Sequence, residues 1–114
     1  MQLPPEGQLL RIFIGESDKH EGLPLYEWLV MEAKEAGLAG ATVLRGLMGF
    51  GAASRIHTSK ILRLSMDLPI VVEIVDTQEK IGEFLEKIEP VVTEGLVTLE
   101  KASIHIYRHQ HTGE

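Results

Sequence analysis

Hydrophobic and polar residues alternate near the start of the chain with the period of a β-strand. Leu10, Ile12 and Ile14 lie two residues apart, with Arg11 and Phe13 between them, and this spacing places the first three on one face of a strand. Similar patterns predict four strands, over about residues 8–15, 41–44, 68–75 and 96–107. The third of these is a near-continuous apolar run, typical of a central strand covered on both faces.

Two segments between these strands have the 3.6-residue period of helices. Gly-Leu-Pro at 22–24 opens the first helix, with Pro24 suited to its first turn, and Gly37 ends it. Asp76 and Glu79 resemble a capping box at the start of the second helix. The clearest apolar stripe in the chain follows at Ile81, Phe84, Leu85 and Ile88.

The predicted element order is β-α-β-β-α-β, which is two similar halves of a split βαβ arrangement. Right-handed crossovers place both helices on one face of a four-stranded antiparallel sheet. We therefore predict an α+β, ferredoxin-like sandwich, formed as a single domain over residues 1–114 with a core at about 8–108. The other face of the sheet stays open, so oligomerisation is a natural way to cover it.

Composition narrows the class of protein without naming a function. The chain has 114 residues, of which 44% are hydrophobic and 25% charged, and it has no Cys. These values predict one soluble domain without disulfides or thiolate metal sites. The first residues lack the pattern of a signal peptide, and no apolar run approaches 18 residues, so we expect a cytoplasmic protein. A net charge of −6 argues against binding to nucleic acid.

The charge is unevenly distributed along the chain. Residues 36–66 contain no Asp or Glu, whereas the remainder of the chain carries all 17 acidic residues. The basic residues in this segment are Arg45, Arg55, Lys60 and Arg63. A small anion such as a phosphate would be attracted there at short range. An ordinary surface with chance clustering of charge is the alternative.

A glycine cluster lies inside this acid-free segment. Gly46, Gly49 and Gly51 follow the second predicted strand with the spacing G-x-x-G-x-G. Glycines leave room for a ligand to approach backbone N–H groups, which favours a phosphate or nucleotide. The spacing matches neither a dinucleotide fingerprint nor a P-loop. The structural alternative is a bent strand end that leads into a hairpin loop.

No catalytic constellation is present in the sequence. Ser54 and His57 lack a nearby acid to orient the imidazole, so we interpret them as polar loop residues. The histidines near the C-terminus match no structural zinc spacing. We therefore expect no catalytic residues, no metal site and no enzyme activity; a small hydrolase or metal-dependent enzyme is the weakest of the hypotheses.

Several strings, in order along the chain, resemble PII signalling proteins. The similarity is closer still to a PII-like family that is known as a domain of unknown function. The strings are Gly-Leu-Pro-Leu-Tyr-Glu (22–27), Ala-Gly-Ala-Thr-Val-Leu-Arg-Gly (39–46), Gly-Phe-Gly (49–51), Ile-His-Thr (56–58), Asp-Leu-Pro (67–69) and Glu-Gly-Leu-Val-Thr (94–98). Together they span roughly residues 8–108.

The resemblance implies a trimer with a ferredoxin-like fold, whose open sheet faces meet around the threefold axis. It also implies ATP or ADP binding in clefts between subunits, and a loop after the second strand that docks onto target enzymes, transporters or channels. That loop corresponds to residues 50–60. The implied ligand-binding residues are Arg45, Leu47, Met48, Gly49, Phe50, Gly51, Arg55, Pro69, Ile70, Glu94, Gly95, Leu96, Val97 and Arg108.

The chain departs from the PII pattern at its phosphate-binding positions. PII proteins carry Arg-Gln after Gly-Phe-Gly, where this chain has Ala52 and Ala53. A lysine follows their Leu-Pro, where this chain has Ile70, and Thr93–Val97 replaces their Gly-Asp-Gly-Lys loop. Each lost charge-assisted contact would weaken phosphate binding by about 1.5–3 kcal/mol.

Two functional hypotheses follow from these observations. The first is a trimeric, PII-like regulator that binds an adenine nucleotide of the ATP, ADP or AMP type as its effector, with Mg²⁺ as an optional companion and no other cofactor. Its target would be a protein such as a membrane transporter or channel. The alternative is a protein-interaction module that binds no nucleotide and regulates a transporter or enzyme through the same loop.

Overall fold

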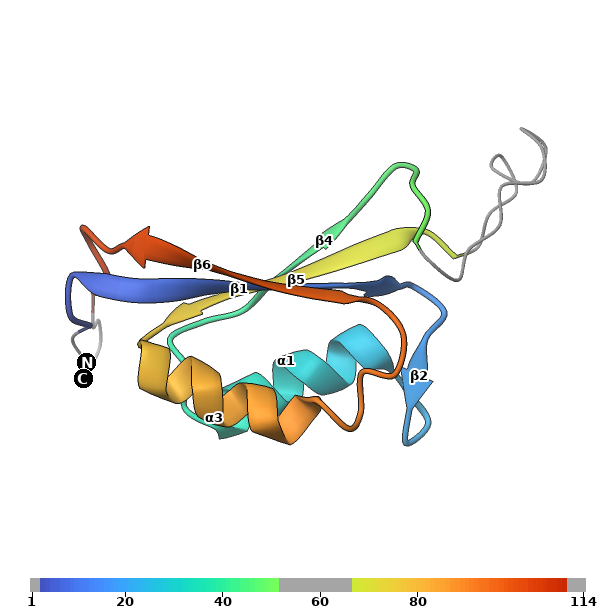
Figure 1. The fold of residues 1–114 in the computed structure, drawn as a ribbon, viewed down its shortest axis with the longest axis horizontal. Coiled ribbons are helices and arrows are strands. Elements are labelled where there is room, and N and C mark those ends of the chain that lie inside the picture. Colours follow the sequence, from blue (N-terminus) through green and yellow to red (C-terminus); the bar gives the residue numbers. More distant parts are fainter. Residues whose placement is uncertain (1–2, 52–66, 111–114) are drawn as a thin grey trace.

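Four strands form one antiparallel sheet in the order β4-β5-β1-β6 (Figure 1). The computed structural model describes residues 3–51 and 67–110. The elements are β1 (Glu6–Gly15), β2 (Lys19–His20), β3 (Leu23–Pro24), α1 (Leu25–Glu35), β4 (Thr42–Arg45), β5 (Pro69–Asp76), α3 (Gln78–Ile88) and β6 (Leu96–Ser103). This architecture confirms the predicted α+β, ferredoxin-like fold.

Helices α1 and α3 lie side by side on one face of the sheet, which we call the covered face (Figure 1). Alternate residues of β1 and β5 point into the layer between helices and sheet, and they are at most 6% exposed. The core consists of Leu10, Ile12, Ile14, Leu25, Leu29, Ala33, Ile70, Val72, Ile74, Ile81, Phe84 and Ile88. Burying this much branched apolar surface is the main force that holds the two layers together.

The opposite face of the sheet has no helix on it within the described part of the chain (Figure 1), and we call it the open face. Residues of β1 and β5 on this side, such as Phe13 and Val71, are only partly buried. The expectation that residues 68–75 form a strand covered on both faces is therefore wrong for a single chain. A second cover for β5 would have to come from outside the described part of the chain.

A small hairpin precedes α1, where the sequence predicts only the opening of a helix. Lys19 and His20 pair with Leu23 and Pro24, and the helix begins one residue later at Leu25. The turn places Glu21 at φ 54° and Gly22 at φ 80°. Two successive residues with positive φ are typical of a tight hairpin turn, and glycine at the second position makes it less costly.

The sequence predicts Asp76 as the N-cap of α3, and this prediction is wrong. Thr77 occupies the N-cap and accepts a hydrogen bond from the Lys80 backbone N–H. The side chain of Asp76 is 0% exposed and accepts hydrogen bonds from the backbone N–H groups of Ala39 (2.8 Å) and Thr77 (2.6 Å). Asp76 thus ties the α1–β4 connection to the end of β5.

The last strand is shorter than predicted, because β6 ends at Ser103 and not at about 107. Its partner strand β1 begins at Glu6, which pairs with Ser103. Beyond that point the backbone makes one further bond, from Ile104 N–H to the Pro5 carbonyl. The hydroxyl of Tyr107 then donates to the Ala39 carbonyl at 2.6 Å, which holds the C-terminal segment against the α1–β4 connection.

Candidate functional site

Most of the predicted site residues gather at one end of the sheet. Here β4 ends at Arg45, β5 begins at Pro69, and β6 begins at Leu96. We call this the loop end; it lies at the right in Figure 1, opposite the terminal end, where β1 begins and β6 ends. Residues 46–51 and 94–97, both among the implied ligand-binding residues, flank the loop end. Arg55 and the rest of 52–60, with Ser54 and His57, lie outside the described residues.

The glycine segment Gly46–Gly51 is built against Pro69. The Gly46 backbone N–H donates to the Pro69 carbonyl at 2.7 Å. A Cβ at Gly46 would lie 2.7 Å from Pro69 Cγ, and one at Gly49 would lie 3.1 Å from the same atom. A Cβ at Gly51, by contrast, would meet no other atom of the described residues within 4 Å. Gly46 and Gly49 therefore allow the close approach to Pro69, whereas Gly51 has no such contact with residues 3–51 or 67–110.

The apolar side chains of this segment face solvent. Leu47 is 95% exposed, Met48 67% and Phe50 70%. The nucleotide hypothesis also places Leu47, Met48, Pro69 and Ile70 together as an apolar wall, but Ile70 is only 2% exposed and lies in the core between sheet and helices. Its side chain is therefore not available to a ligand at the loop end. Pro69, Leu47 and Met48 are the members of that wall that a ligand can reach.

The segment Glu94–Val97 lies at the loop end as well, but at the other edge of the sheet. Gly95 has φ 137°, and a Cβ there would lie 2.4 Å from the Phe13 carbonyl oxygen, so only glycine fits. Strand β4 forms one edge of the sheet and β6 the other. Three strand spacings separate them, about 14 Å. Within one chain, the two predicted phosphate-binding segments thus do not form a single cleft.

Arg108 lies farther away still, at the terminal end of the sheet. It follows Tyr107, whose hydroxyl binds the Ala39 carbonyl beside the end of β5. Strand β5 spans eight residues between this region and Pro69, which corresponds to roughly 23 Å. The predicted ligand residues therefore divide into three groups that one chain keeps apart: 45–51 with Pro69, 94–97, and Arg108.

Acidic side chains from other parts of the chain lie beside the described part of the acid-free segment. Glu16, which follows β1, approaches Arg45 with 3.2 Å between Oε2 and Nε. Asp67 lies at the same end and accepts a hydrogen bond from the Ser17 backbone N–H. Arg45 keeps 59% of its side chain exposed, so it can reach an anion, but Glu16 competes for it. No sequence signal links Glu16 to this site, because the two residues are far apart along the chain.

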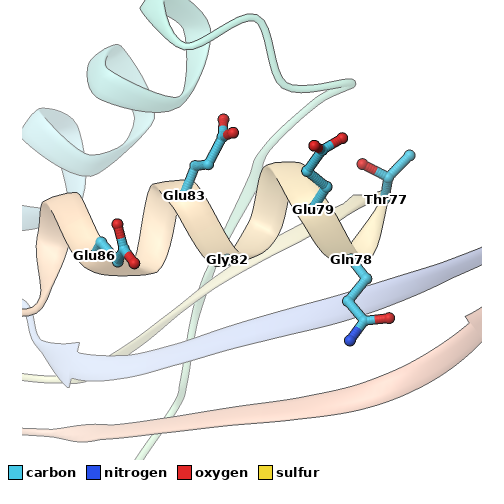
Figure 2. Close-up of a pocket in the computed structure, with 6 residues that line it drawn as sticks. All are labelled: Thr77, Gln78, Glu79, Gly82, Glu83 and Glu86. Carbon is cyan, nitrogen blue, oxygen red and sulfur yellow. The ribbon is translucent and has the colours of Figure 1, made fainter.

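Two hollows occur on the described surface away from the loop end. A pocket of about 310 Å³ lies between the second half of α1 and residues 38–41, lined by Val30, Ala33, Lys34, Leu38, Ala39, Gly40 and Ala41. It lies on the side where Tyr107 binds Ala39. The other follows the outer surface of α3 and includes Glu79, Glu83 and Glu86 (Figure 2). These carboxylates would repel a phosphate.

The acidic residues near the hairpin do not form a metal site. Asp18 accepts from the Gly15 backbone N–H, Glu16 pairs with Arg45, and Glu21 lies beside His20. Within residues 3–51 and 67–110, no group of three or more His, Asp or Glu side chains is placed to hold a metal ion. In those same ranges, no helix is long and apolar enough to cross a membrane.

Comparison with known proteins gives the chain a family context. Residues 7–104 match the model of a family described as DUF190, Uncharacterized ACR, COG1993. A UPF0166 protein of Aquifex aeolicus is 46% identical over 97 residues, covering 85% of this chain and 91% of the relative. A UPF0166 protein of Methanocaldococcus jannaschii is 34% identical over 104 residues, covering 90% and 94%.

Solved structures with similar folds are PII-like. CPII from Thiomonas intermedia K12, a nitrogen regulatory PII-like protein bound to ADP, AMP and bicarbonate, superposes with a TM-score of 0.65 at 20% identity, covering 87% of this chain and 88% of that one. A candidate PII-like signaling protein from Thermus thermophilus gives 0.60 at 17% identity, covering 87% and 89%. At this level of identity, the likeness shows the fold.

Proposed function

The chain belongs to the DUF190 family, and from this premise we propose that it is a PII-like regulatory protein that binds an adenine nucleotide. The nucleotide would bind in clefts between the subunits of a homotrimer in the cytoplasm. Residues 50–60 would carry the signal to a target protein, such as a transporter or channel. The proposal involves no catalysis and no resident cofactor.

One observation carries the proposal: structures that share this fold over nearly the whole chain contain ADP and AMP. The distribution of the predicted ligand residues supports a site between subunits. One chain keeps residues 45–51, 94–97 and Arg108 at separate edges and ends of the sheet. A neighbouring copy that brings its β6 edge to the β4 edge of the first would reunite the first two groups.

The predicted ligand residues divide between the phosphates and the nucleoside part of the nucleotide. Backbone N–H groups of 49–51 and 95–97 would bind phosphate oxygens, with Arg45 and Arg108 supplying positive charge. Both arginines are exposed, as are Gly49, Gly51 and Gly95. Leu47, Met48 and Pro69 would contact the base or ribose. Arg55 belongs to the same proposal.

Calorimetric titration with ATP, ADP, AMP and a cyclic dinucleotide, with and without Mg²⁺, tests the proposal. We expect saturable binding of an adenine nucleotide at about one ligand per subunit, with a micromolar dissociation constant. Protein that is folded and free of co-purified nucleotide, yet binds none of them, would contradict it.

Gly51→Ala locates the site. The new methyl group meets no atom of the described residues, so their fold should be unchanged while a bound phosphate is crowded. We expect about tenfold weaker nucleotide binding with an unchanged oligomer. Gly82→Ala is the matched control, because Gly82 also borders open space but lies on α3, far from the loop end. Equal affinities in the two variants would remove this segment from the site.

A second candidate function is a protein-interaction module that binds no nucleotide. The exposure of Leu47, Met48 and Phe50 favours it, because adjacent exposed apolar side chains are typical of protein contacts. The pairing of Arg45 with Glu16 favours it too. Absence of binding across the nucleotide panel would leave this function as the better one, and capture of a partner through residues 46–51 would then test it.

A further inference from the structure

The open face of the sheet carries a mostly apolar surface with three charged side chains on it, from β5, β1 and β6. The strand register places the apolar members on the same face in neighbouring strands: Leu9, Phe13, Leu44, Val71, Val75 and Leu96. Leu44 is 48% exposed and Leu96 57%. Such a surface is costly to leave in water.

The charged residues are Arg11 from β1, Glu73 from β5 and Glu100 from β6. Arg11 Nε donates to Glu73 Oε2 at 2.9 Å, and Arg11 Nη1 donates to Glu100 Oε1 at 3.1 Å. We call these three the triad. The hydrogen bond with Glu73 raises the pKa of the Arg11 guanidinium above its ordinary value. The Arg11 guanidinium therefore stays charged at physiological pH, and an apolar partner would offer this charge no further hydrogen bond.

The triad has hydrogen-bonding groups that its own bonds do not use. Arg11 binds each glutamate through one nitrogen and one carboxylate oxygen. Within the described residues, the Arg11 Nη2 group and the second oxygen of each carboxylate therefore have no hydrogen-bond partner. A purely apolar partner would bury these groups unpaired, which is strongly unfavourable. A highly charged partner would instead leave Phe13, Val71 and Leu96 facing polar groups.

A second copy of this chain meets both requirements, because it presents apolar side chains together with a guanidinium and two carboxylates. We propose that the triad is the self-recognition element of the open face, with the Nη2 group of Arg11 in one copy donating to a triad carboxylate of another copy. This inference rests on the self-association included in the proposed function. It adds the residues that decide which partner and which register the face accepts.

Reversing all three charges tests the inference. The variant Arg11→Glu/Glu73→Arg/Glu100→Arg keeps the contacts within its own chain with opposite polarity, so it should associate with itself. Against wild type, it would bring like charges together. We expect the two proteins to sort into separate oligomers when they are co-expressed with different tags and analysed by native mass spectrometry, with mixed species reduced at least about tenfold below the statistical level.

A matched control reverses a charge pair elsewhere. Lys87 of α3 and Glu32 of α1 form an ion pair of 2.8 Å between the helices, on the side away from the open face. The variant Lys87→Glu/Glu32→Lys should mix statistically with wild type. Statistical mixing of the triad variant as well would overturn the proposal, as would a wild-type protein that stays monomeric at micromolar concentration.

A single substitution keeps the test decisive if the triple variant fails to fold. Glu100 lies on an edge strand with 55% of its side chain exposed, so the fold of the single chain tolerates changes there. Glu100→Arg reverses the charge and should weaken self-association about tenfold, whereas Glu100→Gln only removes the charge and should weaken it clearly less. Equal effects would overturn the proposal. Nucleotide titration of wild type is independent of this outcome, so a failed nucleotide site and a failed recognition element are distinguishable.

Discussion

The two faces of the sheet use the same strands for different purposes. On β1, Ile12 points to the helices and is 0% exposed, whereas its neighbour Phe13 points to the open face and is only partly buried. On β5, Val72 and Val71 show the same contrast. Both faces are rich in apolar residues, yet a single chain buries only one of them. The covered face therefore stabilises the folded chain, and the open face has apolar surface left for association.

The largest expected effect comes from truncating one residue on each face of β1. Ile12→Ala leaves a cavity between sheet and helices and should lower the free energy of unfolding by about 2–5 kcal/mol. Phe13→Ala removes a larger side chain from the open face and should leave the single chain folded while abolishing or weakening self-association. Urea unfolding and sedimentation measure the two effects.

The contrast between the two faces would be contradicted if Ile12→Ala and Phe13→Ala had the same effect on stability. Equal losses of stability at low protein concentration, where association is absent, would mean that Phe13 packs within its own chain as Ile12 does. Val72→Ala and Val71→Ala repeat the test with one residue type on β5. Their difference should be smaller, about 1–2 kcal/mol, because fewer methyl groups are removed.

Much of this two-faced sheet can be predicted from the sequence because period-2 alternation is a local signal. The spacing of Leu10, Ile12 and Ile14 identifies β1, and the stripe from Ile81 to Ile88 identifies α3. What alternation cannot show is whether a face is covered. The near-continuous run over 68–75 predicts two covered faces, yet the described residues cover only one of them, so a second cover would have to come from outside those residues.

Polar residues at the ends of elements are harder to predict. Asp76 and Glu79 have the spacing of a capping box, but Thr77 is the cap and Asp76 binds a loop that is 37 residues away in sequence. Its partner is a backbone N–H group, which every residue except proline possesses, so nothing in the sequence marks it. The hairpin at 19–24 does carry a signal in Glu21-Gly22, which the following helix pattern obscures.

In the candidate site, too, the individual residues can be predicted from the sequence but their arrangement in space cannot. Gly46, Gly49 and Gly95 stand out in the sequence, and the structure gives physical reasons for each of them. Their distribution over two edges of the sheet depends on strand order, which no local string contains. The pairing of Glu16 with Arg45 also depends on the arrangement of the strands, so the sequence does not predict it. This pairing changes the charge that a ligand would meet at Arg45.

A second prediction compares the polar groups of the two faces. Asp76 ends β5 on the covered face, fully buried, and holds two backbone N–H groups. Asp76→Ala leaves both donors without this acceptor and should lower the free energy of unfolding by about 2–4 kcal/mol. Glu73→Gln, three residues earlier and on the open face, should barely change unfolding of the single chain. Chemical unfolding below the association concentration measures both.

The expected contrast has a structural reason and a clear contrary result. Asp76 is shielded from water, so no solvent replaces its carboxylate, whereas Glu73 keeps 30% of its side chain exposed. If Asp76→Ala unfolds no more easily than Glu73→Gln, the α1–β4 connection is held by other contacts. The bonds from Lys80 to Gly37 and from Tyr107 to Ala39 would then be the ones to remove next.

The smallest expected effect concerns Arg45, which does not follow the contrast between a buried and an open face. Its register opposite Ile70 places it on the covered face, yet 59% of its side chain is exposed, and Glu16 is its partner. A nucleotide phosphate would have to compete with Glu16, so Glu16→Gln should tighten nucleotide binding by about two- to fivefold, in line with the small contribution of an exposed ion pair. Glu21→Gln removes the same charge from the adjacent hairpin, where Glu21 contacts His20 and not Arg45. Nucleotide titration of both variants shows whether the ion pair or the net charge matters. Tighter binding in Glu16→Gln alone means that the ion pair restrains Arg45, whereas equal tightening in both variants means that only net charge matters. No change in either variant would place Arg45 outside the site.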